Sequence, residues 1–138
     1  MNTVLPHWPA ETVAILATVG GGPHAIPVSA SWRAGETQIL LGLAERRGSL
    51  QRLRGQPQVA IALLAAQLAV TAHGRASVLD APLVPGVAAV LIEVESLTDH
   101  MRPTFAIQSG VQWGWTDEKA ALRDREVRAA LARLADDL

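Results

Sequence analysis

The chain has 138 residues, a net charge of −1 and no cysteine. Its length is typical of a single domain of about 100–200 residues, and its near-neutral charge argues against a general attraction to nucleic acid or an anionic membrane. The lack of cysteine excludes disulfides, thiolate metal sites and cysteine nucleophiles, and favours a cytoplasmic protein. No segment has the pattern of a signal peptide, and the apolar runs are shorter than the about 20 residues that cross a membrane.

The first quarter of the chain predicts a β-hairpin. Residues 1–12 contain two prolines and are expected to be an extended lead-in. A short apolar run at 13–19 predicts a buried strand, and a glycine-rich turn connects it to a second strand at 24–32. Pro27 cannot donate to a β-ladder, so the second strand is expected at a sheet edge or a bulge, where its backbone can face a ligand.

The remaining elements are again mostly strands. We expect further strands at 37–43, 58–66, 68–79 and 87–97, a short helix at 45–54 and a last helix at 117–136. Gly74 marks a bulge or a close approach of two strands. The last helix has an apolar stripe, formed by Val127, Ala130, Leu131 and Leu134, and is charged elsewhere, so it should lie on a surface. Six short strands without a repeated βα unit predict a barrel or a sandwich.

A basic segment follows the third predicted strand. It carries Arg46, Arg47, Arg52 and Arg54, with Ser49 between them. Guanidinium groups bind phosphate oxygens in bidentate fashion, and a helix start adds free backbone N–H groups. The ordinary alternative is a solvated helix face. A nucleic-acid site is a further alternative, which the net charge and the scarcity of aromatic residues disfavour.

Other kinds of site find little support in the sequence. His7 and His100 have no partner at metal-ligand spacing, so no metal is expected. No Ser/His/Asp combination is evident, and the glycines at 20–22 do not match a phosphate-binding loop.

Three stretches in order carry a family resemblance. They are AILATVGGGPHAIPVSASW at 14–32, LLGLAERRGSLQRLRGQPQVAIALL at 40–64 and VTAHGRASVL at 70–79. Together they resemble the pyridoxamine 5'-phosphate oxidase-like family of FMN-binding split β-barrels over about residues 10–98. The resemblance implies one flavin-binding domain over 1–138, built as a six-stranded antiparallel split β-barrel with a short helix after the third strand and a C-terminal helix. It also implies a homodimer that holds FMN at its interface and oxidises or reduces a small molecule.

The resemblance further implies which residues contact the cofactor. The strand residues would lie beside the flavin ring; they are Pro27, Val28, Ser29, Ala30, Leu41, Gly42 and Leu43. The basic segment would hold the phosphate through Arg46, Arg47, Ser49 and Leu50. Ser49 departs from the family, in which a lysine is frequent near this position. His73 lies on a strand near the expected groove. Trp113 and Trp115 either pack on the barrel or the dimer interface, or one of them closes over the flavin or its substrate from the neighbouring chain.

The resemblance does not determine the reaction. A deazaflavin coenzyme in place of FMN is one alternative, and a non-catalytic flavin- or haem-binding protein is another. No catalytic side chain is assigned, because a bound flavin supplies the chemistry itself. The substrate and the electron donor stay open.

Overall fold

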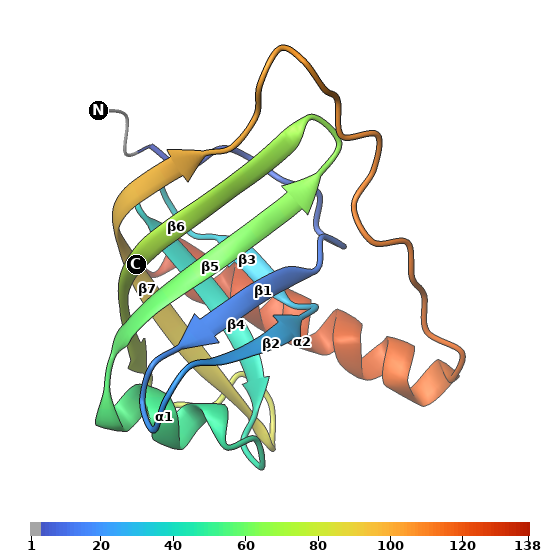
Figure 1. Cartoon of the computed structure of the whole chain (residues 1–138). Coiled ribbons are helices and arrows are strands. Elements are labelled where there is room, and N and C mark those ends of the chain that lie inside the picture. The colour runs from blue at the N-terminus through green and yellow to red at the C-terminus, as the bar shows by residue number, and fades with distance from the viewer. Residues whose placement is uncertain (1–3) are drawn as a thin grey trace.

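The computed structural model describes residues 4–138, which form one curled antiparallel sheet and two helices (Figure 1). The strands are β1 (Ala14–Thr18), β2 (His24–Val28), β3 (Ser31–Arg33), β4 (Gln38–Ala44), β5 (Gln58–Ala65), β6 (Leu68–Val78) and β7 (Val87–Asp99). The helices are α1 (Ser49–Gly55) and α2 (Glu118–Asp136). Residues 1–3 of the predicted lead-in lie outside the described part. The mainly β split-barrel prediction is confirmed, with seven strands in place of six.

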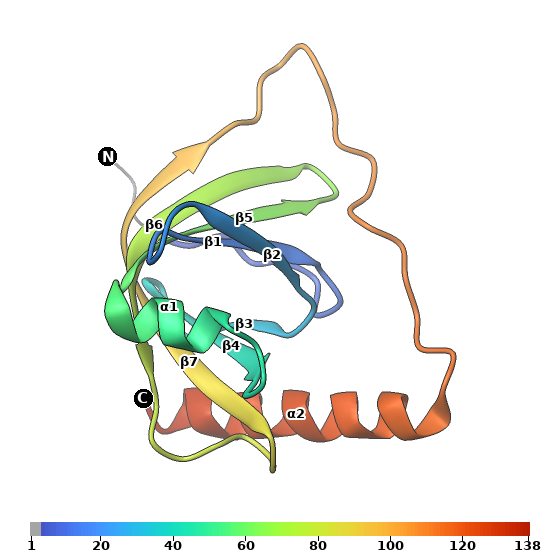
Figure 2. The ribbon, with the colours of Figure 1, turned by 60° about the horizontal axis from the view of Figure 1, so that its bottom comes forward.

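The order of strands in the sheet explains why the barrel is split. The order is β2-β1-β5-β6-β7-β4-β3, so the two edge strands are consecutive in the chain. Residues 29–30 connect them, and the sheet curls until its two edges face each other (Figure 2). The seam between the edges has no β-ladder across it, which leaves backbone groups there for other partners.

The prediction of one continuous strand over 24–32 is wrong at this seam. Val28 packs in the interior of the barrel, whereas Ala30 and Trp32 pack in a second cluster on the other face of β4. The chain therefore leaves one edge of the sheet at Val28 and enters the other at Ser31. This break is what adds the seventh strand.

Helix α2 covers the outer face of β4 and creates the second cluster. Leu131 of α2 is fully buried there against Leu40 of β4. As a result three consecutive residues of β4 are buried, Ile39, Leu40 and Leu41, rather than every second one. By contrast, β5 has only its inner face covered, and burial alternates along most of its length.

Helix α1 closes one end of the barrel and is shorter than predicted. Residues 45–47 form a turn, Gly48 is the N-cap, and the helix therefore begins at Ser49. Leu50 and Leu53 form the buried face of this helix. Asp117 caps α2 by accepting a hydrogen bond from the backbone N–H of Lys119.

Gly74 is a point of close approach, as its place in the sequence predicts. The register of β6 against β7 shifts between His73 and Gly74. A Cβ atom on Gly74 would lie 2.1 Å from the carbonyl oxygen of Glu93, so any side chain would force the strands apart.

The segment between β7 and α2 is irregular and arches away from the barrel (Figure 2). It is attached to the β5–β6 turn by a hydrogen bond from the Gln67 N–H to the Ile107 carbonyl, and to the lead-in by one from Trp113 Nε1 to the Glu11 carbonyl. Within residues 4–138, neither helix combines the length and apolar character needed to cross a membrane.

Candidate functional site

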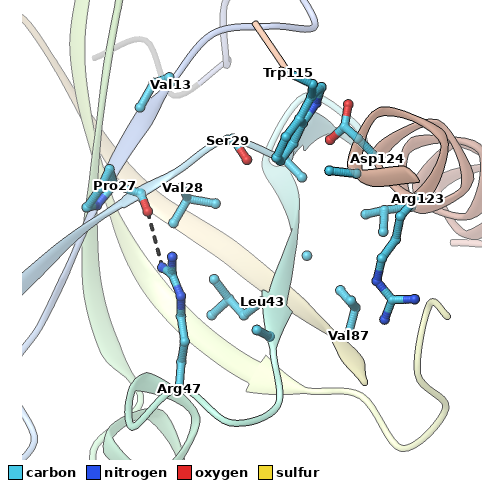
Figure 3. Close-up of a pocket in the computed structure, with 15 residues that line it drawn as sticks. Val13, Pro27, Val28, Ser29, Leu43, Arg47, Val87, Trp115, Arg123 and Asp124 are labelled. Carbon is cyan, nitrogen blue, oxygen red and sulfur yellow. Dashed lines mark hydrogen bonds between the residues drawn. The ribbon is translucent and has the colours of Figure 1, made fainter. Parts of the chain in front are cut away.

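A cavity of about 480 Å³ lies at the seam of the barrel, between the β2–β3 connection, β4 and α2 (Figure 3). Such a volume is within the range of about 300–1,000 Å³ typical of small-molecule sites. Eight of the residues predicted to contact a cofactor line it: Pro27, Val28, Ser29, Ala30, Gly42, Leu43, Arg47 and Trp115. The sheet edges bring these residues together from four separate parts of the chain.

One wall of the cavity is the β2–β3 corner, residues 27–30. Backbone carbonyls of this corner accept hydrogen bonds from other parts of the chain. The Pro27 carbonyl accepts one from Arg47 Nη1 at 3.3 Å, and the Ser29 carbonyl accepts one from Arg128 Nη2 at 2.7 Å. The Ala30 carbonyl accepts one from the Gly42 N–H at 3.1 Å. The corner is therefore held by its carbonyl groups.

The floor of the cavity is β4, together with Val87 at the start of β7. Leu43 and Val87 make this floor apolar, and Arg47 and Arg123 stand on either side of it (Figure 3). Gly42 allows α2 to pack closely here, because a Cβ atom on it would lie only 3.0 Å from Val127 Cγ1. An apolar floor between two cationic groups suits a flat, partly apolar ligand that carries negative charge.

The opposite wall is the amino-terminal half of α2. Ala120, Arg123, Asp124 and Val127 line the cavity from one face of the helix, at the spacing i, i+3, i+4 and i+7. Arg123 donates to the Pro85 carbonyl, and Asp124 forms an ion pair of 2.8 Å with Arg128. The sequence-based prediction missed this wall, although the apolar stripe that begins at Val127 extends back through the same face.

Trp115 closes one side of the cavity, although 47% of its surface is exposed. Its ring meets that of Trp113 edge to face, with 5.3 Å between the ring centres. Trp113 in turn is held by its hydrogen bond to the lead-in. Trp113 therefore packs against the lead-in, and Trp115 faces the cavity of its own chain.

No family model matches the sequence, and no curated protein matches it either. Solved structures do match the fold. A candidate pyridoxamine 5'-phosphate oxidase from Listeria innocua superposes with a TM-score of 0.54 at 14% identity, over 64% of this chain and 87% of that one. The chain has the fold of the pyridoxamine 5'-phosphate oxidase-like split barrels. HupZ of Group A Streptococcus shares this split barrel with a TM-score of 0.56 and 18% identity, over 75% of this chain and 90% of the other. An FMN-binding protein from Syntrophomonas wolfei shares it with a TM-score of 0.55 and 10% identity, over 64% and 77%.

Five residues predicted to contact a cofactor do not line the cavity of this split barrel. Leu41 is fully buried in the barrel interior, and Ser49 and Leu50 are buried at the start of α1. Arg46 is exposed outside the cavity. His73 lies in a separate hollow on the outer face of the sheet, beside Gln58 and Glu95.

The four arginines of the basic segment have different surroundings. Arg47 reaches the cavity. Arg52 instead donates to the carbonyls of Gly20 and Gly22, which ties the β1–β2 turn to α1. Arg46 and Arg54 are exposed. Among residues 4–138 there is no group of three or more His, Asp or Glu side chains arranged to hold a metal ion.

Proposed function

We propose that the chain is an FMN-binding flavoprotein, an oxidoreductase that acts on a small molecule. The observation that carries this proposal is the cavity, where the β2–β3 corner, β4, Arg47 and Trp115 meet. The corner, β4 and Arg47 fall within the family resemblance, and Trp115 comes from the segment that precedes α2. The FMN-binding protein from Syntrophomonas wolfei, which has the same fold, adds support.

The residues of the cavity suit the parts of FMN. Arg47 provides a guanidinium group for the phosphate. Leu43, Val28 and Trp115 provide apolar and aromatic surface for the flat ring. Bound FMN supplies the transfer of electrons or hydride, and the protein binds, orients and shields the ring. Asp124 is the one carboxylate in the lining, and it forms its ion pair of 2.8 Å with Arg128.

The proposal includes a homodimer that completes the site. On the outer face of β1 and β5, Ile15 and Leu64 are exposed by 39% and 50%, and the alanines between them are apolar. Pro27, which lines the cavity, is paired with Ile15 on the same edge of the sheet. A second copy on this apolar face would therefore border the cavity at Pro27.

A deazaflavin coenzyme is the second candidate ligand. An F420 reductase superposes with a TM-score of 0.53 at 13% identity, over 64% of this chain and 90% of the other. The same cavity and the same arginines would serve its ring and its anionic tail. A split barrel that binds flavin or haem without turnover is the remaining alternative.

The experiment is a visible spectrum of the purified protein, followed by titration with FMN, coenzyme F420 and haem. We expect FMN to bind with a flavin absorption band and quenched fluorescence, and gel filtration to give the mass of a dimer. Binding of F420 or haem in preference to FMN would replace the cofactor proposal. A colourless monomer that binds none of the three would refute it.

A further inference from the structure

We propose that Arg128 is a positioning residue for the cavity. It holds the β2–β3 corner so that the backbone N–H groups of Ser29 and Ala30 are left free to bind acceptor atoms of the ligand. This inference rests on the proposed function for the identity of the ligand, and it adds a residue of α2 that does not itself line the cavity.

Arg128 connects three parts of the chain. Its Nη2 donates to the Ser29 carbonyl at 2.7 Å, its Nη1 donates to the Ala10 carbonyl, and its Nε pairs with Asp124 at 2.8 Å. The side chains of Arg128 and Asp124 are only 16% and 14% exposed, so water competes little with these bonds. A planar guanidinium group can satisfy three acceptors in fixed directions, which a lysine cannot.

The hydrogen bonds of the corner involve the carbonyls of Ser29 and Ala30 rather than their N–H groups. The carbonyls of Ser29 and Ala30 are both occupied, by Arg128 and by the Gly42 N–H. The N–H groups of Ser29 and Ala30 make no hydrogen bond within residues 4–138. Both residues line the cavity, and Ala30 is only 6% exposed. An N–H group of a residue in the cavity wall that lacks a protein partner can bind a ligand acceptor.

The N–H groups of Ser29 and Ala30 determine which ligand atoms can bind at the corner. The wall offers N–H groups and has its carbonyls largely taken, so it selects atoms that accept hydrogen bonds, such as ring carbonyl oxygens or a carboxylate. The flavin and deazaflavin rings both carry carbonyl oxygens on one edge. The family resemblance likewise implies that residues 27–30 lie beside the ring and that Arg47 lies at the phosphate.

The test compares Arg128→Met with Arg128→Lys and with Arg125→Met as a matched control. Arg125 lies on the exposed surface of the same helix and outside the cavity. Nuclear magnetic resonance follows the Ser29 and Ala30 amides, first without ligand and then with saturating FMN. In the unsubstituted protein and in Arg125→Met, FMN should slow exchange of both amides by about tenfold or more, the effect of one new hydrogen bond each.

In Arg128→Met, FMN affinity should fall by about tenfold, and saturating FMN should no longer protect the two amides. For Arg128→Lys, the FMN affinity and the protection of the two amides should lie between those of the unsubstituted protein and those of Arg128→Met, because one ammonium group can keep only part of the contacts. A purely structural role would lower the melting temperature but leave protection intact at saturation, and that result would overturn the proposal. So would FMN that binds the unsubstituted protein without protecting either amide.

The spectra without ligand separate this inference from the proposed function. Arg128→Met should displace or broaden the Ser29 and Ala30 amide signals while most other signals keep their positions. Unchanged corner signals would overturn the positioning role, whichever cofactor binds. If the unsubstituted protein binds no FMN but the corner signals move in Arg128→Met, only the choice of ligand is refuted. If Arg128→Met does not fold, the same two measurements on the milder Arg128→Lys test the positioning role: the corner amide signals without ligand and the amide protection at saturating FMN.

Discussion

Replacement of Arg47 by alanine tests the phosphate end of the cavity most directly. Arg47 lines the cavity, its side chain is exposed, and this side chain donates a long hydrogen bond of 3.3 Å to the Pro27 carbonyl. Loss of that exposed contact should change stability by no more than about 0.5 kcal/mol. Loss of hydrogen bonds to a charged phosphate should weaken FMN binding by about 1.5–3 kcal/mol, or roughly 10- to 150-fold in Kd.

Fluorescence quenching gives the Kd of FMN and of riboflavin for the unsubstituted protein and for Arg47→Ala, so the arginine and the phosphate are each removed in turn. Riboflavin lacks the phosphate, so Arg47→Ala should weaken FMN binding and leave riboflavin binding nearly unchanged. Arg46→Ala is the control, because Arg46 is also exposed but lies outside the cavity. Equal losses for FMN and riboflavin would mean that Arg47 acts by holding Pro27. Equal effects of the Arg46 and Arg47 substitutions would refute the assignment of the phosphate to Arg47.

Three further predictions concern the fold and are measured by urea unfolding. Thr18 has a buried hydroxyl without a partner in the described part of the chain, so Thr18→Val should stabilise the protein by about 1 kcal/mol, and a loss would mean that the hydroxyl is bonded. Gly74→Ala should destabilise the protein by about 1–3 kcal/mol, because the added Cβ atom overpacks against the neighbouring strand. Gly48→Ala is the control, because its Cβ position has open space around it. Equal losses of stability in the two variants would contradict overpacking as the cause. Leu131→Ala should cost about 2–5 kcal/mol, whereas Leu122→Ala on the exposed side of α2 should cost little. A small cost at Leu131 would show that α2 unfolds independently of the barrel.

Most of the fold could be predicted from local patterns. A short apolar run bounded by a glycine-rich turn predicted β1, and the apolar stripe of α2 predicted that this helix lies on a surface. Pro27 predicted that its strand lies at a sheet edge or a bulge, because a missing N–H group is tolerated only where no ladder bond is needed. Strand β2, which contains Pro27, is an edge strand. The strand over 24–32 could not be divided correctly, because its alternation continues through a corner whose position depends on where the two sheet edges meet.

The site was predictable only in part. The corner and Arg47 were found through the family resemblance, and the cavity contains both. The sequence did not predict the roles of three α2 residues, Arg123, Asp124 and Arg128. They belong to a helix outside the resemblance, and their pattern is that of an ordinary charged helix face.

The sequence by itself determined most of the strands, both helices and a mainly β fold, because these follow from periodicity and backbone chemistry within short windows. Only the tertiary structure decided which arginine serves which purpose. Arg52 is taken up by the carbonyls of the Gly20–Gly22 turn, Arg47 reaches the cavity, and Arg128 holds the corner. A guanidinium group binds whatever carbonyls and anions the fold brings within reach, and the curl of the sheet sets that distance.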